Sequence, residues 1–339
     1  MAGFKLIAKI LGRLLGTAFL VLIVLWLFFF VGPKTPAEHP SWGVTFSADY
    51  ARGLGLDADT ALQALLTDMG VKYLRLIAPW NVIQPRMDQF DFRELDQEMA
   101  AAAEHNAKVI LAVGMKTPRW PECHLPDWAK SLDQAKQQAA VVAYVQKVVE
   151  RYKSAPALTR LQIENEPFLR YFGECPWQET PDFVRREIAA VKAIDPDHPV
   201  LITDSGEWSL LFNTASMGEV LGTTLYRRVF FNPSQSYLTY PFNPVFYARK
   251  RWLVQQIFHK DVINVELQAE PWGRKSLTEI SAAEQNKTMD INQFKDIIQF
   301  AQDTGFNEFY LWGAEWWYYM KTVRNDASYW NEAKQLFAG

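Results

Sequence analysis

The sequence predicts an α/β fold: a (β/α)8 or TIM barrel, with eight parallel strands in a closed ring, preceded by one transmembrane helix. From residue 42 onward, short apolar runs alternate with amphipathic stretches, which is the pattern of repeated βα units. There are eight such runs, and 339 residues suffice for one barrel of roughly 250 to 300 residues. The first 32 residues differ, because basic residues precede a long apolar stretch.

The N-terminal segment is predicted to anchor the chain in the cytoplasmic membrane. Its apolar stretch is uncharged and long enough to cross a hydrocarbon core as a helix. A cleaved signal peptide is the alternative, but its apolar region is usually shorter and ends in small residues, whereas this one ends in three phenylalanines. Basic residues before the span favour a cytoplasmic N-terminus and an extracytoplasmic barrel. The predicted segments are a basic N-terminus (1–13), a single-pass anchor (14–32), a linker (33–41) and the barrel domain (42–339).

Each strand is predicted from a short apolar run bounded by turn residues. The sixth run has the weakest pattern. The predicted strands are 42–47, 72–78, 107–114, 159–165, 199–205, 223–229, 262–268 and 308–314.

Helices are predicted between the strands from apolar residues at helical spacing. The first has an Asp at its start, a common N-cap, and Gly70 after its end. The predicted helices are 57–70, 92–105, 132–152, 181–194 and 291–305.

Polar residues stand at the ends of two predicted strands. Asn165 and Glu166 end the fourth strand, and Glu266, Gln268 and Glu270 lie at the end of the seventh, on one face if that strand stays regular. The carboxyl ends of barrel strands form the functional mouth, so these side chains are expected to face a pocket. Two carboxylates in such a pocket split their pKa values, which suits glycoside cleavage.

Composition and spacing argue against several other functions. The net charge is −3 with dispersed basic residues, which does not suggest a nucleic-acid surface. The five His show no two-His zinc spacing, and no Gly-rich phosphate loop follows a strand, so neither a metal nor a cofactor is predicted. Aromatic residues reach 14%, with 13 Trp. These rings either fill the core or line a cleft where they stack on sugars.

Two longer motifs resemble a known group of enzymes. The motif "ENEP" (164–167) ends the fourth strand, and a glutamate ends the seventh. The second motif, "KYLRLIAPWNVIQPRMDQFDFRELDQEM" (72–99), has an Arg expected at the end of its strand and a Trp after it. These features resemble the clan A (β/α)8 glycoside hydrolases, which include many cellulases, xylanases, mannanases and β-galactosidases. The resemblance implies a retaining glycosidase with a β-linked substrate.

The resemblance also assigns roles to individual residues. Glu166, after the Asn of the motif, would be the general acid/base, and Asn165 would hold the sugar 2-hydroxyl. Arg75 would keep the nucleophile ionised, although it could instead lie between a strand and a helix. Glu266 is the expected nucleophile, and Glu270 is its rival.

Three aromatic residues complete the predicted sugar site. Tyr226 matches a strand-six tyrosine that hydrogen-bonds the nucleophile, and Trp312 matches the strand-eight tryptophan beneath the cleaved sugar. Trp80, the tryptophan of the 72–99 motif, is a further substrate-binding candidate. Glu164 is expected to alternate away from Glu166 into a structural ion pair.

Cys123 and Cys175 are predicted to form a disulfide. They fall in the loops after the third and fourth strands, which are adjacent in a barrel. Outside the cytoplasm such a bond would persist.

The predicted function is that of a membrane-anchored retaining glycoside hydrolase. It would cleave β-linked sugars in an extracytoplasmic oligo- or polysaccharide by double displacement, and its partners would be that substrate and the lipid bilayer. A transglycosidase with the same site and a non-catalytic carbohydrate-binding barrel are the alternatives. The aromatic stretch 227–252 would form either a lid or a contact with the membrane surface.

Overall fold

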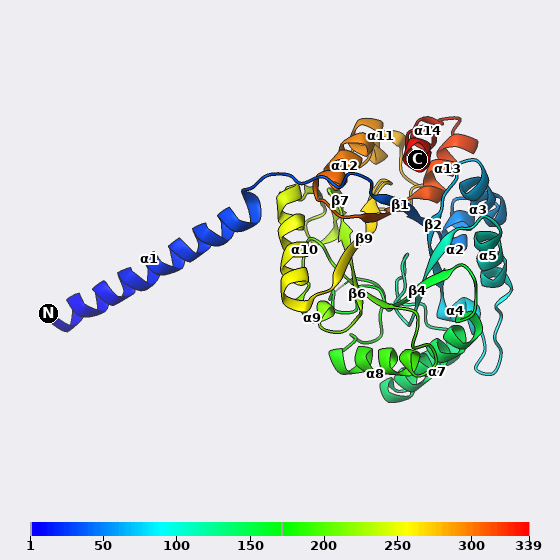
Figure 1. The fold of residues 1–339 in the computed structure, drawn as a ribbon, viewed down its shortest axis with the longest axis horizontal. Coiled ribbons are helices and arrows are strands. Elements are labelled where there is room, and N and C mark those ends of the chain that lie inside the picture. Colours follow the sequence, from blue (N-terminus) through cyan, green and yellow to red (C-terminus); the bar gives the residue numbers. More distant parts are fainter. Residues whose placement is uncertain (1, 171, 339) are drawn as a thin grey trace.

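A computed structural model describes residues 2–170 and 172–338. Within these ranges, eight parallel strands close into a barrel in the order β1-β10-β9-β6-β5-β4-β3-β2 (Figure 1). The (β/α)8 prediction is therefore confirmed. The barrel strands are β1 (Ser41–Thr45), β2 (Tyr73–Ala78), β3 (Lys108–Val113), β4 (Leu158–Ile163), β5 (Val200–Asp204), β6 (Val220–Leu225), β9 (Asp261–Gln268) and β10 (Glu308–Trp312).

The sixth strand begins and ends earlier than predicted. After Leu225 the chain leaves the barrel and forms an antiparallel hairpin of β7 (Arg228–Phe231) and β8 (Ser236–Thr239). The side chain of Gln268 explains the departure, since its oxygen accepts from the backbone N–H groups of Arg227 and Arg228. Those groups are therefore not free to continue the barrel ladder.

Helices surround the barrel, and all five predicted ones are present. The Asp57 side chain accepts from the Thr60 backbone N–H and caps its helix as expected. The helices of the barrel domain are α2 (Ala48–Gly53), α3 (Ala58–Thr67), α4 (Trp80–Ile83), α5 (Arg93–Glu104), α6 (Asp127–Lys130), α7 (Gln134–Tyr152), α8 (Pro181–Lys192), α9 (Phe212–Ala215), α10 (Pro244–Phe258), α11 (Ala282–Gln285), α12 (Ile291–Asp303), α13 (Ala314–Thr322) and α14 (Ser328–Lys334).

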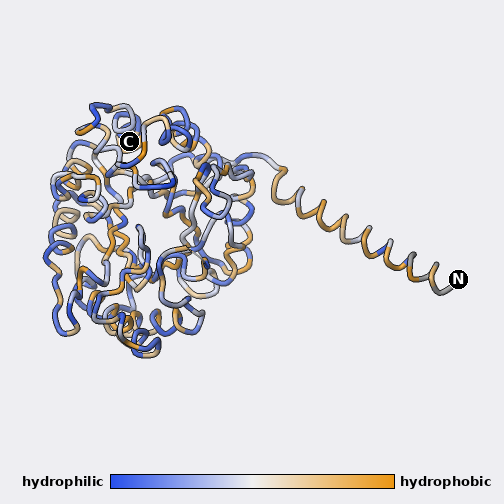
Figure 2. The backbone as a smooth tube through the Cα atoms, turned by 180° about the vertical axis from the view of Figure 1, so that it is seen from behind, coloured by the Kyte–Doolittle hydropathy of each residue, from blue (hydrophilic) through white to orange (hydrophobic). Residues whose placement is uncertain are grey.

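The N-terminal helix α1 (Ala2–Phe30) extends away from the barrel (Figures 1 and 2). Its apolar part, Lys9–Phe30, has 22 residues and a mean hydropathy of 2.3. No residue of its most apolar 18-residue stretch is buried inside the protein. It is long and apolar enough to cross a membrane. The helix also includes most of the predicted basic segment. Met1 and Gly339, the outer ends of the first and last predicted segments, lie outside the described residues.

Candidate active site

Arg75 is the centre of a buried hydrogen-bond network at the carboxyl ends of the strands. It lies in β2 and has no exposed surface. Its Nε donates to Gln162 Oε1 at 2.8 Å and its Nη2 to Asn165 Oδ1 at 2.8 Å. Its Nη1 donates to Glu266 Oε1 at 2.9 Å. Arg75 therefore joins β4 to β9 inside the barrel and does not lie between a strand and a helix.

Glu266 is held through both of its carboxylate oxygens. Oε1 accepts from Arg75, and Oε2 accepts from the Tyr226 hydroxyl at 3.0 Å. The side chain is buried, and Arg75 supplies the positive charge that a buried carboxylate requires. Burial, and next the negative charge of Glu266, raises the pKa of Tyr226 well above its usual range, so the phenol keeps its proton and donates.

The predicted alternation of Glu266, Gln268 and Glu270 required a strand that stays regular to residue 270, but β9 ends at Gln268 and contains a bulge. Asn264 and Glu266 pair with two successive residues of β6, so Val265 is an extra residue in β9. Such a bulge changes the direction in which side chains point. The bulge precedes Glu266, and Glu270 lies two residues past the end of β9. The three side chains reach different partners: Arg75 and Tyr226 for Glu266, the start of the hairpin for Gln268, and Arg119 and Tyr50 for Glu270.

Glu166 lies just past β4 in an unusual backbone conformation. Its φ is 44° and that of Glu164 is 57°, both in the left-handed region that non-glycine residues rarely adopt. The Glu166 backbone N–H donates to Thr203 Oγ1 at 2.7 Å, which helps to hold this turn. Burial, and next the charge of Glu266, raises the pKa of Glu166 well above its usual range. Glu166 therefore holds a proton under conditions where an exposed glutamate has lost it.

Asn165 is fixed at both ends of its amide. Its Oδ1 accepts from Arg75, from Gln162 at 3.2 Å and from Thr203 at 3.3 Å. Its Nδ2 donates to Glu122 Oε2 at 3.1 Å. One of the two Nδ2 hydrogens is therefore committed to the protein, which leaves the other for a ligand.

Glu122 is a third buried carboxylate at this site, and it is not among the residues predicted from the sequence. Burial, partly offset by Lys116, raises its pKa from 4.5 to about 7, and the charge of Glu266 contributes to the rise. The residue lies in the loop after β3 with a left-handed φ of 69°. No motif marks this position, although it immediately precedes Cys123, one of the two cysteines of the chain.

Glu270, the rival nucleophile, belongs to a separate ionic cluster. It forms an ion pair with Arg119 and accepts from the Tyr50 hydroxyl at 2.9 Å. Arg119 also pairs with Glu315 at 2.9 Å. Its guanidinium carbon lies 3.8 Å from the centre of the Tyr50 ring and 4.0 Å from that of Trp312, within the range of a cation–π contact.

Trp312, the predicted platform for the cleaved sugar, is thus partly covered by the protein itself. It ends β10 and is 4% exposed. The Arg119 guanidinium covers part of the Trp312 ring, so only the uncovered part of the ring can contact a ligand. No sequence pattern marks Arg119, because the partners of its side chain all lie more than 60 residues away.

Trp80 is not at the site, which corrects its assignment as a substrate-binding residue. It has no exposed surface and begins α4. Its indole N–H donates to Gln84 Oε1 at 2.9 Å, and its ring packs on Trp128 and Tyr144 at centroid distances of 5.6 and 5.8 Å. Trp80 is therefore a core residue between the barrel and its helices.

Aromatic rings lead from the surface to the site. Trp120 is 64% exposed and makes an edge contact with Phe172 at 6.4 Å between centroids. Phe172 stacks on Trp272 at 5.9 Å, and Trp272 makes an edge contact with Tyr226 at 5.2 Å. This series ends at the tyrosine that binds Glu266, so it forms an apolar wall beside the carboxylate.

Glu164 does not form the ion pair expected of it. Its oxygens accept from the backbone N–H groups of Met115 and Lys116 at 2.8 and 2.6 Å, and the buried carboxyl group of Glu187 lies close enough to affect its pKa. Burial raises the pKa of Glu164 to about 7 and that of Glu179 to about 8. The pKa of Glu187 is well above its usual range, again through burial first.

Because the pKa values of Glu164, Glu179 and Glu187 are raised in the folded protein, we expect the free energy of unfolding to fall as pH rises. In the unfolded chain they lose their protons near 4.5, whereas in the folded chain Glu164 and Glu179 keep them to about 7 and about 8. Their contribution is complete below the unfolded pKa and is lost as pH rises through the folded values. Glu187→Gln should remove one titrating group, so between about pH 5 and about pH 8 the unfolding free energy of this variant should fall by less than that of the wild-type protein. Urea unfolding at the two pH values tests this; equal losses in both proteins would contradict it.

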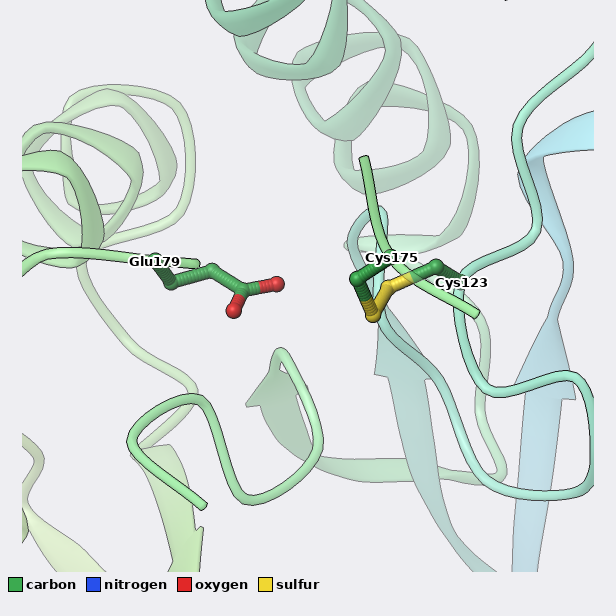
Figure 3. A group of neighbouring side chains, drawn as sticks. All are labelled: Cys123, Cys175 and Glu179. Carbon is green, nitrogen blue, oxygen red and sulfur yellow. A yellow bond between two sulfur atoms is a disulfide. The ribbon is translucent and has the colours of Figure 1, made fainter. Parts of the chain in front are cut away.

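Cys123 and Cys175 form the predicted disulfide. Figure 3 shows the carboxylate of Glu179 facing it, and the three side chains place potential metal-ligand atoms within 4.8 Å of one another. Disulfide sulfurs carry no thiolate, so this group offers a metal only one carboxylate. The bond joins the loop that carries Glu122 to the loop after Glu166.

Replacing both cysteines by serine is expected to destabilise the protein by about 2 to 4 kcal/mol, because the bond closes a long loop in the unfolded chain. The two residues are 52 positions apart. Activity should also fall, since Glu122 adjoins Cys123. Denaturant unfolding with and without reductant measures the change. The unfolding free energy of the double variant should be the same with and without reductant. If reductant also left the unfolding free energy of the wild-type protein unchanged, the prediction would be contradicted.

The model of the family Glyco_hydro_42, described as beta-galactosidase, matches residues 59–182, a segment that includes Arg75, Asn165 and Glu166 but not Glu266. The comparison with curated proteins finds no match.

Solved structures share the barrel at low sequence identity. GH5_18 from Streptomyces cattleya, in complex with GlcNAc, is 17% identical, with 81% of this chain and 70% of that chain covered and a TM-score of 0.59. The exo-beta-1,4-mannosidase Op5Man5 from Opitutaceae bacterium strain TAV5 is 15% identical, with 84% and 53% covered and a TM-score of 0.55. The beta-galactosidase from the psychrophilic Marinomonas ef1 is 13% identical, with 80% and 53% covered and a TM-score of 0.55. The family match and the shared barrel together confirm the resemblance of this chain to the clan A (β/α)8 glycoside hydrolases.

Proposed function

We propose that the protein is a membrane-anchored retaining glycoside hydrolase that cleaves β-linked sugars in an extracytoplasmic oligo- or polysaccharide. One observation carries the proposal. Glu266 is paired with Arg75 and Tyr226, while the pKa of the nearby Glu166 is raised by burial and by the charge of Glu266. Two carboxyl groups with these different environments suit a nucleophile and a general acid.

In the first step, a Glu266 oxygen attacks the anomeric carbon and forms a glycosyl ester. The bond from that carbon to the leaving oxygen breaks, and Glu166 gives its proton to this oxygen, which departs as an alcohol. The Tyr226 hydroxyl and Arg75 hold the attacking carboxylate in one orientation. The free Nδ2 hydrogen of Asn165 can donate to the sugar 2-hydroxyl.

In the second step, water releases the sugar. Glu166, now ionised, takes a proton from water as the oxygen of that water attacks the anomeric carbon. The ester bond breaks, Glu266 regains its carboxylate, and Glu166 regains its proton. Two inversions leave the product with the configuration of the substrate.

The substrate class is proposed from the site and from the structural neighbours together. The neighbours include a β-1,4-mannosidase, a β-galactosidase and complexes with Manβ1-4GlcNAc. The rings of Trp120, Phe172 and Trp272 beside the site can stack on the apolar faces of sugars. β-Mannosides, β-galactosides and β-glucosides are therefore the first substrates to test.

The proposed anchor is α1, with the N-terminus in the cytoplasm and the barrel outside the membrane. The apolar length of Lys9–Phe30 supports a span, and the basic residues before it support this orientation. The Cys123–Cys175 disulfide fits an oxidising compartment.

Trapping of the glycosyl ester tests the proposal. The detergent-solubilised full chain is incubated with 2-deoxy-2-fluoro derivatives of the three glycosides, and the labelled peptide is located by mass spectrometry. A glycosyl mass on Glu266 is expected. A mass on Glu270 would keep the mechanism and change the nucleophile, whereas sugar binding without adduct or turnover would favour a non-catalytic barrel. Product analysis with added acceptor sugar separates hydrolysis from transglycosylation.

A further inference from the structure

The end of α1 is packed against the outer face of α10. The Phe30 ring stacks on Phe246 at 5.5 Å, and the Phe28 ring contacts Trp252 at 6.0 Å between centroids. Asn243, the N-cap of α10, donates from Nδ2 to the Phe30 carbonyl at 2.8 Å. These contacts place the start of α10 level with the end of the apolar stretch of α1.

Apolar side chains are exposed along the same side of the barrel. Trp252 and Ile257 of α10 are 44% and 53% exposed. Phe212 begins α9, is 38% exposed and contacts Phe258 at the end of α10 at 6.0 Å. Figure 1 shows α9 and α10 as the side of the barrel nearest α1. We call these three exposed residues, Phe212, Trp252 and Ile257, the α10 flank.

Cations predominate along α10 itself, although Asp261 follows Lys260 and Glu219 lies near that lysine. Between residues 240 and 260 the chain has Arg249, Lys250, Arg251 and Lys260 and no Asp or Glu. Lys250 is buried, but the other three are partly exposed. The Arg249 guanidinium lies 5.2 Å from the centre of the Phe28 ring, at the end of α1. A surface that combines exposed aromatic and aliphatic residues with cations suits the headgroup region of an anionic bilayer.

We propose that the α10 flank docks on the surface of the membrane, in the headgroup region of anionic phospholipids. This inference rests on the proposal that α1 crosses the bilayer. If the apolar stretch ends at Phe30, residues packed on Phe28 and Phe30 lie at the membrane interface, where tryptophan is enriched. Cations beside them attract anionic lipid headgroups.

Docking would also fix the direction of the active site. In Figure 1 the ring of strands is seen nearly end-on, and α1 leaves from its side. With the α10 flank on the bilayer, the barrel axis runs along the membrane and the mouth opens sideways. The enzyme would then take saccharide that lies beside the membrane surface, such as the headgroup of a glycolipid or a polymer emerging from the bilayer.

Site-specific labels on the full chain test this docking. Both native cysteines are in the disulfide, so an introduced cysteine is the one free thiol. Ile257→Cys, Met87→Cys and Phe19→Cys would each carry a fluorescent label in vesicles of phosphatidylcholine and phosphatidylglycerol. Met87 is 61% exposed and lies in the segment between α4 and α5, two helices that Figure 1 shows across the barrel from α10. Phe19 reports whether α1 is inserted.

The expected result is several-fold stronger quenching at position 257 than at position 87 by lipids with a headgroup nitroxide. Quenching at position 19 by acyl-chain nitroxides should accompany it. If 19 is quenched but 257 behaves like 87, the anchor stands and the docking is wrong. If 19 is not quenched, the anchor and the docking both fail. Quenching at 257 that persists unchanged without phosphatidylglycerol would overturn the requirement for anionic lipid.

Discussion

Replacing Glu266 by alanine is expected to lower kcat/KM by about 10⁴-fold or more, equivalent to roughly 5.5 kcal/mol of transition-state stabilisation. The reason is that Glu266 is the only nucleophile in the proposed mechanism, and it is the carboxylate that Arg75 and Tyr226 hold in place. Substrate binding should change much less, because the sugar hydroxyls are held by other groups. Steady-state kinetics on an aryl β-glycoside measure the loss.

Azide should restore turnover of the alanine variant in a way that identifies the missing group. With Glu266→Ala, azide enters the vacated space and attacks the anomeric carbon directly, so the product is an α-glycosyl azide. With Glu166→Ala, the ester on Glu266 still forms, and azide then attacks it to give a β-glycosyl azide. NMR of the two products reports their configuration. An α-glycosyl azide from Glu270→Ala instead would transfer the nucleophilic role to Glu270.

Glu270→Gln is the matched control, because Glu270 lies on the same segment and is equally buried. It should retain far more activity than Glu266→Gln. The two glutamine variants should also differ in pH profile. Loss of the Glu266 charge removes a cause of the raised pKa of Glu166, so the pKa of Glu166 should fall in that variant. Titration of Glu166 by infrared spectroscopy would show the shift, and an unchanged pKa would contradict the coupling.

The sequence predicted most of the fold because strands and helices in a βα barrel are local patterns. Each of the eight apolar runs overlaps an observed barrel strand. The sixth strand was misplaced because the predicted run extended to Val229, and its last two residues, Arg228 and Val229, do lie in a strand, but in β7 of the hairpin. A side chain 40 residues away, Gln268, directs them there, and no local pattern contains that information.

The residues of the site that were predicted belong to local sequence motifs, whereas those that were missed are positioned by contacts with distant residues. Motifs at strand ends led to Arg75, Asn165, Glu166 and Glu266, which the structure brings into one network, although their catalytic roles stay predictions. Loop residues such as Glu122 were missed, because a left-handed backbone and distant partners position them. Helical and strand spacing cannot reveal either feature.

Arg119→Met is expected to destabilise the protein by about 3 to 5 kcal/mol, the cost of breaking a buried ion pair by removing one partner. Glu270 and Glu315 are 5% and 0% exposed, and both pair with Arg119. Methionine preserves much of the packing between Tyr50 and Trp312 but supplies no charge. Arg52→Met is the matched control, because the Arg52–Glu94 pair is partly exposed and should be worth less than about 1 kcal/mol.

The pH dependence identifies the charge as the cause. Burial raises the pKa of Glu315 and the charge of Glu270 adds to the rise, while Arg119 opposes both. Without Arg119 the Glu315 carboxyl group should hold its proton to higher pH, so Arg119→Met should lose more stability at about pH 8 than at about pH 5. Neutralising Glu270 and Glu315 to glutamine in the same protein should recover most of the loss. A destabilisation that is independent of pH and unaffected by those two changes would mean that Arg119 acts through its packing on Trp312 rather than through its charge.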